Sequence, residues 1–315
     1  MNVISGGIVG GGVCVLDGGL ATEVEARGVI IEGDPLWSAR LLHSDPTLIE
    51  AVHLSFLEHD SDIITTASYQ ASVDGFIRHL GVTHDNALDL IGRSVTIAKQ
   101  ARDRFLKDSP NKTPLIAGSV GPYGACQADG SEYHGRYVDH MTREQLIDWH
   151  RPRVARLLDC GVDLLAFETI PSQKEGEVLM RLLGEFPTAR AWLSFSCKDG
   201  VHCCYDDTFR DAVISCCSVS SQLVAVGVNC TEPGYVEGLL SSCSGCTDLP
   251  FIVYPNSGES WTRTEGWSGD CVRGFSSYLP KWVELGAHVI GGCCRVTPSD
   301  IKLLSDTLRT MKLSA

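Results

Sequence analysis

Three cysteines stand directly after short apolar segments of the sequence. Cys230 follows residues 223–229, and the pair Cys293 and Cys294 comes shortly after residues 289–290. Zinc prefers thiolate sulfur in tetrahedral geometry, and a catalytic zinc site leaves one of its four positions open. Three cysteines brought together would leave that fourth position for a water molecule or a substrate.

The adjacent cysteines Cys293 and Cys294 also permit a structural interpretation, because free cysteine packs as a small hydrophobic residue. Neighbouring residues of a regular strand point to opposite faces. We therefore expect Gly291 and Gly292 to allow an irregular turn that directs both sulfurs inward. Spacing alone does not decide between a metal site and packing.

The other cysteines favour packing or have no role that the sequence assigns. Four lie in apolar segments and are expected to pack there: Cys160, Cys197, Cys216 and Cys217. Cys203 and Cys204 follow residues 191–197, which places them near the same site without making them ligands. Cys243 and Cys246 precede residues 251–254 and are expected at the opposite end of the fold. The ten histidines include no H-E-x-x-H pair, which disfavours a hydrolytic zinc site.

Eight short apolar, β-rich segments must position these side chains. They are residues 13–16, 63–69, 115–119, 164–169, 191–197, 223–229, 251–254 and 289–290. Their nearly continuous apolar character is typical of strands covered on both faces. Segments of helical period separate them, and four helix starts are marked by capping signals: Thr142 with Gln145, Ser172 with Glu175, Asp45 before Pro46, and Thr297 before Pro298.

Alternating strands and helices predict parallel strands, and eight such units favour a single (β/α)8 TIM barrel over residues 1–315. An open doubly wound sheet is the alternative. Catalytic groups of such barrels lie at the C-terminal ends of the strands, so Asp17 and Glu168 should share one rim with the cysteines. The long excursions 18–44 and 121–141 are expected to cover the site.

Composition excludes several classes of partner. A net charge of -13 argues against binding to nucleic acid or to an anionic membrane surface, and leaves a small molecule as the expected partner. No apolar stretch approaches the length of a membrane span, and the N-terminus lacks the basic start of a signal peptide. We expect a cytoplasmic protein, in which fourteen cysteines favour metal ligation, catalysis or packing over disulfides.

The chain resembles the homocysteine S-methyltransferase family over essentially its whole length. Five motifs carry the resemblance, in the family's order: L-D-G-G-L-A-T-E from Leu16, T-T-A-S-Y-Q from Thr65, F-E-T-I-P from Phe167, G-V-N-C from Gly227 and G-G-C-C-R from Gly291. The resemblance implies a (β/α)8 barrel that binds one zinc ion through Cys230, Cys293 and Cys294. It also implies that the sulfur of homocysteine takes the fourth position.

Five further residues are implied as substrate contacts: Asp17, Gly18, Glu168, Asn229 and Tyr69. Rim carboxylates suit the ammonium group of homocysteine, and main-chain amides of the Gly18 turn suit its carboxylate. Asp17 could instead only cap the turn before Gly18.

The methyl donor is expected to be cationic, and methionine is the expected product. The chain length and the turn at Tyr69 favour S-methylmethionine, with S-adenosylmethionine as a slower substitute. Aromatic faces of Tyr69, Trp37 and Trp261 are candidates for holding such a cation. A betaine-type or selenocysteine-type methyltransferase and a non-enzymatic zinc-thiolate protein remain alternatives, and the sequence leaves the oligomeric state open.

Overall fold

The computed structural model describes residues 12–262, 266–268 and 271–314, and within them a closed ring of parallel strands. The strands are β1 (Cys14–Val15), β2 (Ile63–Thr65), β3 (Leu115–Val120), β4 (Leu164–Ile170), β5 (Ala191–Phe195), β6 (Leu223–Asn229), β7 (Phe251–Tyr254) and β10 (Ala287–Ile290). They pair in the order β1-β10-β7-β6-β5-β4-β3-β2. A parallel bridge between Leu16 and Ile63 joins the two ends of this order. The predicted (β/α)8 barrel is therefore confirmed.

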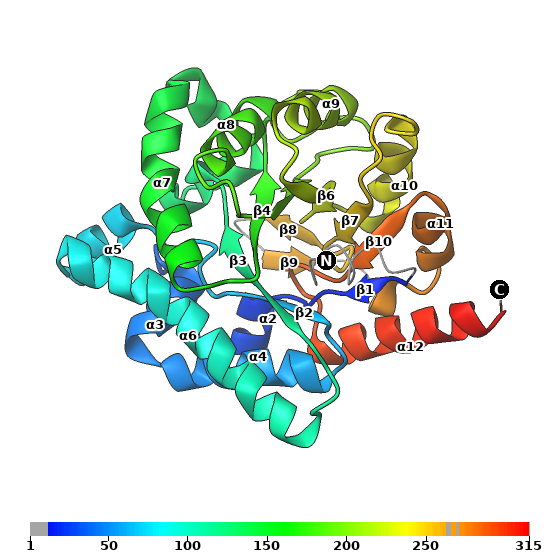
Figure 1. Ribbon diagram of the computed structural model, residues 1–315, viewed down its shortest axis with the longest axis horizontal. Helices are drawn as coiled ribbons and strands as arrows, with labels where there is room; N and C mark the ends of the chain where they lie inside the picture. The colour runs from blue at the N-terminus through cyan, green and yellow to red at the C-terminus, as the bar shows by residue number, and fades with distance from the viewer. Residues whose placement is uncertain (1–11, 263–265, 269–270, 315) are drawn as a thin grey trace.

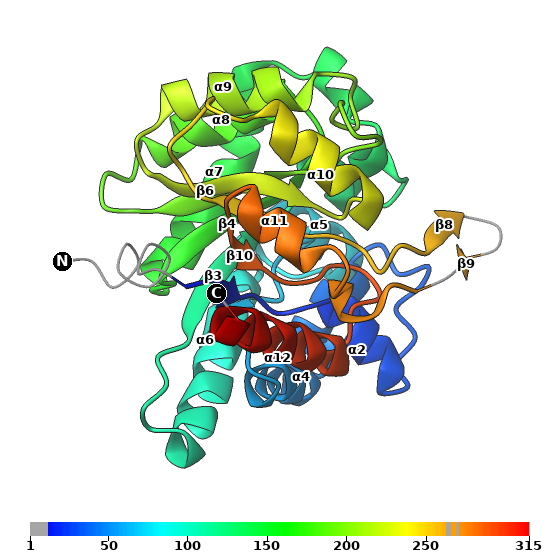
Figure 2. The same ribbon diagram turned by 90° about the vertical axis from the view of Figure 1, so that its right-hand side faces the viewer.

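Helices surround the strands, as Figure 1 shows. The longer ones are α4 (Pro46–Glu58), α5 (Val73–Leu80), α6 (His84–Asp108), α7 (Arg143–Asp159), α8 (Gln173–Leu183), α9 (Phe209–Val219), α10 (Pro233–Ser242) and α12 (Pro298–Ser314). Shorter helices are α2 (Leu20–Ala26), α3 (Leu41–Ser44) and α11 (Leu279–Glu284), with 3-10 turns η1 (Trp37–Arg40), η2 (Tyr123–Gln127), η3 (Ser131–Tyr133), η4 (Arg136–Asp139) and η5 (Arg273–Phe275). A two-stranded hairpin of β8 (Ser260–Thr262) and β9 (Gly266–Ser268) follows β7 and projects from one end of the barrel (Figure 2).

The hydrophobic core has two parts, as expected for strands covered on both faces. Every residue of β4 and of β5 is buried. One cluster fills the inside of the barrel and includes Leu16, Ala166, Trp192 and Ile252, each almost fully buried. The larger cluster lies between the strands and the helices. Continuous apolar segments are thus explained by burial from both sides.

The second strand is shorter than the sequence predicts. We expected it to reach residue 69, but β2 ends at Thr65. Beyond that point Ser68 N donates to the carbonyl of Thr66, and the hydroxyls of the same two residues lie 2.7 Å apart. The chain therefore turns here, because side-chain hydroxyls compete with the strand ladder for backbone partners.

The capping predictions are confirmed with one difference. Thr142 and Gln145 form a reciprocal capping box at the start of α7. Ser172 caps α8 through the amide of Glu175, but the Glu175 carboxylate turns away to His150, with Oε1 3.0 Å from the ring Nε2. The sequence signal fixed the start of α8, and a contact 25 residues away decided where the glutamate side chain points.

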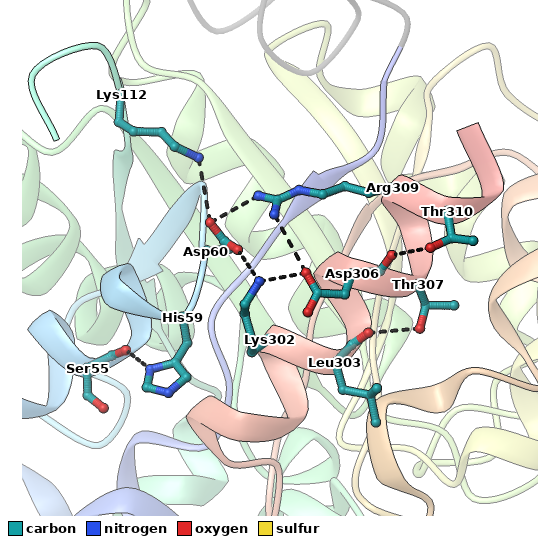
Figure 3. Close-up of polar contacts among 10 residues, drawn as sticks. All are labelled: Ser55, His59, Asp60, Lys112, Lys302, Leu303, Asp306, Thr307, Arg309 and Thr310. Atoms are coloured by element: carbon teal, nitrogen blue, oxygen red, sulfur yellow. Dashed lines mark hydrogen bonds and ion pairs between the residues drawn. The ribbon is translucent and has the colours of Figure 1, made fainter. Parts of the chain in front are cut away.

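An ionic cluster around Asp60 ties the last helix to the first βα unit (Figure 3). Asp60 lies just after α4 with a φ of 71° and accepts from Lys302 and Arg309 of α12, each at 3.0 Å. Lys112, before β3, is 3.8 Å away. The cluster joins segments more than 200 residues apart, and so supports closure of the barrel. Among the described residues, no helix has the length and apolar character needed to cross a membrane.

Candidate active site

A cavity opens at the C-terminal ends of the strands, and the three predicted metal ligands and the five predicted substrate contacts line it. It measures about 970 Å³ including its open mouth. Its walls come from the ends of β1, β2, β3, β4, β6, β7 and β10, and from the two long excursions that follow β1 and β3. The expectation that these excursions cover the site is therefore confirmed.

The three predicted cysteines converge at this cavity. Cys230 directly follows β6, while Cys293 and Cys294 follow β10, and their three sulfurs lie within 4.8 Å of one another. A disulfide bond joins Cys230 to Cys293 in this structure, with Cα atoms 5.5 Å apart. In the reduced state the three thiolates could hold a metal ion, since soft sulfur donors at this spacing suit tetrahedral coordination.

The glycines before the cysteine pair act differently from our prediction. Neither Gly291 nor Gly292 has a positive φ; within this region Cys230 and Arg295 do, at 45° and 66°. A Cβ on Gly291 would lie 2.7 Å from the carbonyl oxygen of Asp17, and one on Gly292 only 2.1 Å from a methyl of Val296. The glycines are needed for close packing, and not for an unusual backbone conformation.

Asp17 is held by the end of β2. Its Oδ2 accepts from the Thr65 amide at 2.7 Å and from the Thr65 hydroxyl at 3.1 Å. The side chain is 3% exposed. Burial raises the pKa of Asp17 well above its usual range despite the bonds from Thr65, and the nearby charge of Glu168 raises it further. A cation bound between these two carboxylates would relieve both effects.

Glu168 lies at the C-terminal part of β4 and is also buried, with 7% of its surface exposed. It accepts hydrogen bonds from the hydroxyls of Ser119 and Tyr254, the latter at 3.1 Å. Burial raises the pKa of Glu168 to about 7, although both bonds oppose this effect. The Tyr254 oxygen in turn accepts from Trp192 Nε1 at 3.0 Å, so the carboxylate belongs to an ordered network.

Asn229, at the end of β6, uses both of its polar atoms within the protein. Its Oδ1 accepts from the Thr169 amide at 2.6 Å, and its Nδ2 donates to the Thr169 hydroxyl at 2.8 Å. The same Nδ2 lies 4.0 Å from the sulfur of Cys293. These contacts make Asn229 a positioning residue, and its predicted contact with substrate stays a prediction.

The remaining predicted contacts, Gly18 and Tyr69, also line the cavity. A Cβ at position 18 would meet the Val296 carbonyl at 2.6 Å, which explains why glycine occupies it. The carbonyl of Tyr69 accepts from Arg153 at 3.0 Å. Arg153 is buried beneath the rim and also donates to the carbonyl of Gly121, so it joins the loops after β2 and β3.

The other cysteines do not form a second metal site. Within the described part of the chain, Cys230, Cys293 and Cys294 are the one group of three or more potential ligands. Cys203 is fully buried, and its backbone forms an isolated antiparallel β-bridge with that of Cys197, while Cys243 is buried at the end of α10. These two cysteines pack, as apolar cysteine commonly does.

Several cavity residues carried no motif that sequence reasoning could use. Glu25 and Trp37 come from the first excursion, and Glu132 and Tyr133 from the second. Of these we predicted only Trp37. The signal that points to the others is their place in long excursions after strands. The side chain of Trp261 lies outside the described part of the structure, so its predicted role stays untested.

The fold and the site together define a barrel enzyme with a potential metal centre made of cysteine sulfur. The family model described as homocysteine S-methyltransferase matches residues 14–308, and the chain belongs to this family. It is a methyltransferase that acts on homocysteine. The family assignment is incompatible with the non-enzymatic alternative.

Similar proteins agree with this assignment. The homocysteine S-methyltransferase of Escherichia coli is 45% identical over 93% of this chain and 94% of its own length. The metallated form of the homocysteine methyltransferase MmuM from Escherichia coli superposes with a TM-score of 0.86, at 42% identity over 96% of this chain and 99% of the other.

Two relatives bear names with other substrates. A betaine-homocysteine S-methyltransferase of Drosophila melanogaster is 39% identical over 92% of both chains. A selenocysteine Se-methyltransferase of Brassica oleracea var. italica is 42% identical over 95% of this chain and 89% of its own. Family membership therefore leaves the methyl donor and the range of acceptors undecided.

Proposed function

We propose that this protein transfers a methyl group from S-methylmethionine to homocysteine in a zinc-dependent reaction that yields methionine. The observation that supports this proposal most directly is the negative charge of the cavity. Four carboxylates line it, those of Asp17, Glu25, Glu132 and Glu168, together with the three cysteines. Among the described residues that line it there is no lysine, arginine or histidine. Such a cavity favours positively charged substrate groups over anions.

The cysteine site suits zinc in its reduced state. Cys230, Cys293 and Cys294 would hold the ion through three sulfurs and leave one position for the thiol of homocysteine. A bound zinc ion would supply a Lewis acid that keeps this thiol deprotonated near neutral pH. The reported metallated form of the Escherichia coli relative supports a metal here.

The protein's own residues would orient homocysteine. We place its ammonium group against Asp17 and Glu168, whose pKa values are raised by burial and would fall again beside a bound cation. Its carboxylate would meet main-chain amides of the Gly18 turn. Tyr69 and Asn229 complete the proposed contacts, with Asn229 acting mainly through Thr169.

The transfer itself needs no general acid. The homocysteine sulfur attacks the methyl carbon in line, the carbon–sulfur bond of the donor breaks, and its electron pair stays on the departing neutral thioether. No proton has to be delivered to this leaving group. S-adenosylmethionine carries the same sulfonium group and is the proposed slower substitute. The absence of an acid–base pair from the predicted site agrees with this chemistry.

The test combines metal content with product formation. Reduced protein should bind one zinc ion per chain and form methionine from homocysteine and S-methylmethionine. Cys293→Ser should abolish both, whereas Cys204→Ser, at a neighbouring cysteine outside the metal group, should retain both. Full turnover by metal-free protein would contradict the zinc mechanism.

A betaine-type or selenocysteine-type activity is the second candidate, favoured by the two relatives that bear those names. Betaine carries a quaternary ammonium group, so an acidic cavity would also favour this part of the molecule. A panel of three donors and two acceptors, compared by kcat/KM, separates the candidates. The cytoplasmic location and the extent of the single domain, residues 1–315, stay predictions.

A further inference from the structure

We propose that Glu132 binds the positively charged group of the methyl donor. This inference rests on the proposed function and assigns a residue that the family motifs quoted above do not include. Glu132 lies in η3, within the excursion after β3, and lines the cavity. Its side chain is 6% exposed, and its Oε2 atom is buried without a hydrogen-bond partner. A buried carboxylate oxygen is normally paired, so this one calls for a partner that the protein does not supply.

The backbone around Glu132 is firmly built. The Ser131 amide donates to Asp129 Oδ1 at 2.9 Å, and the Gly135 amide donates to the Ser131 carbonyl at 2.8 Å. A Cβ on Gly124 would lie 2.7 Å from the Glu132 amide nitrogen, so η2 packs directly against this turn. The backbone that carries the Glu132 side chain is therefore held at the cavity wall by close packing and by hydrogen bonds of the turn.

No basic side chain compensates the charge. Among the described residues, those that line the cavity include no lysine, arginine or histidine. Burial raises the pKa of Glu132 to about 7, and the nearby charge of Asp129 adds to the effect. The charged form of this carboxyl group is thus unfavourable until a cation lies beside it, which is typical of a binding site whose cation arrives with the ligand.

Glu132 lines the same cavity as the three cysteines, on the wall supplied by the excursion after β3, whereas Asp17 and Glu168 come from the ends of β1 and β4. A methyl group can reach a sulfur held at the cysteines only when the donor approaches to roughly 3–3.5 Å in line. The positively charged groups of the donor must therefore lie in the same cavity as the cysteines, no farther from them than the length of the donor molecule.

The chemistry predicts which kinetic constant depends on Glu132. The sulfonium charge of the donor disappears as the methyl group leaves, so a carboxylate beside it stabilises the bound donor more than the transition state. A contact with the donor's ammonium group stabilises both states equally. In either case loss of the carboxylate should raise the KM for the donor without lowering kcat.

The experiment compares Glu132→Gln with Glu144→Gln in the zinc-loaded, reduced enzyme. Glu144 is the control, because its carboxylate is exposed at the start of α7 and does not line the cavity. We expect Glu132→Gln to raise the KM for S-methylmethionine about tenfold or more, and Glu144→Gln to change it less than threefold. The KM for homocysteine should change less than threefold in both variants. An unchanged donor KM in Glu132→Gln, or an equal rise in Glu144→Gln, would overturn the proposal.

Calorimetric binding gives a second readout that does not depend on turnover. Methionine is the neutral thioether counterpart of S-methylmethionine, so the ratio of their Kd values measures recognition of the sulfonium charge.

A donor without an ammonium group, dimethylsulfonioacetate, distinguishes the two possible contacts. A raised KM for both donors in Glu132→Gln assigns the sulfonium, and a raised KM for S-methylmethionine alone assigns the ammonium group.

Two controls keep the outcome interpretable. If Glu132→Gln does not fold, Glu132→Asp takes its place: the displaced carboxylate should raise the donor KM alone, and an unchanged value overturns the inference. Wild-type protein that methylates homocysteine from none of the donors refutes the proposed function. If the wild-type protein is active and the Glu132 variants have an unchanged KM for the donor, only this inference is refuted.

Discussion

The side chain of Asn229 binds Thr169 through both of its polar atoms and thereby joins the ends of β6 and β4. Asn229 immediately precedes Cys230, and Thr169 immediately follows Glu168. Thr169 and Cys230 both have positive φ values, 60° and 45°, which residues with a Cβ rarely adopt. One amide side chain therefore couples the backbone of a proposed metal ligand to that of a proposed substrate contact.

Replacing Asn229 should disturb both of these residues. Asn229→Ala removes two buried hydrogen bonds and leaves the Thr169 amide unpaired, so we expect a loss of about 2–3 kcal/mol in the free energy of unfolding. Relaxation of Thr169 and Cys230 should lower kcat/KM at least tenfold. Thr169→Val keeps the amide bond to Asn229 and removes the hydroxyl contacts with Asn229 and Tyr69. It should therefore have the smaller effect on both quantities. Urea unfolding and steady-state kinetics measure them, and equal effects of the two changes would contradict the coupling.

Glu168→Gln should weaken homocysteine binding and increase the stability of the folded protein at high pH. The folded pKa of Glu168 is raised to about 7 from a usual value of 4.5. Between these values the folded state retains a proton that the unfolded chain releases, so the free energy of unfolding falls as pH rises. This contribution amounts to up to about 3 kcal/mol.

The stability of the Glu168→Gln variant should not fall with rising pH in this way. The variant should therefore be more stable than wild type at pH 8, while its KM for homocysteine rises at least tenfold. Unfolding curves between pH 5 and pH 8 measure the difference. The exposed Glu144→Gln serves as the control. A wild-type pH slope that persists unchanged in Glu168→Gln would refute the burial argument.

Gly292→Ala should damage the cysteine site by overpacking. The added methyl would lie 2.1 Å from Val296, and such insertions cost about 1–3 kcal/mol in folded cores. We expect a lower melting temperature and less bound metal per chain. Gly234→Ala on α10 is the control, because the nearest atom is 3.8 Å away. The Cβ of Val296 would itself lie 2.4 Å from the added methyl, so Val296→Gly, which removes the whole side chain, is the rescue change. It should restore metal binding to Gly292→Ala in part, and no restoration would argue against the steric cause.

Asp60→Asn should destabilise the protein without affecting catalysis, because the cluster of Figure 3 lies away from the cavity. The Asp60 carboxylate pairs with Lys302 and Arg309, which lower its pKa against the opposing effect of partial burial. Partly exposed pairs contribute up to about 1 kcal/mol each. The pKa of Asp60 is lowered, so its stabilisation is present above the usual pKa of 3.8 and is lost as pH falls through the folded value.

The difference between Asp60→Asn and wild type should therefore vanish in acid and shrink in high salt. Thermal unfolding at several pH values and salt concentrations checks this prediction. A parallel fall in kcat/KM at neutral pH would show instead that the cluster supports the active site.

The sequence by itself determined the elements and most of the candidate site. Apolar segments buried on both faces predicted all eight barrel strands, because burial leaves a local signature in hydrophobicity. Cys230, Cys293 and Cys294 were singled out because strand ends and motifs are also local. Helix starts such as those at Thr142 and Ser172 followed from side chains that bond amides three residues away.

Only the tertiary structure decided which of these groups have partners. The end of β2, the contact of Glu175 with His150 and the steric role of Gly292 depend on neighbours that are distant in sequence or fixed by packing. The buried, unpaired oxygen of Glu132 is another such property, since a missing partner can be recognised only after every surrounding element is in place. Packing and desolvation are collective properties of the folded chain, whereas sequence patterns record local preferences.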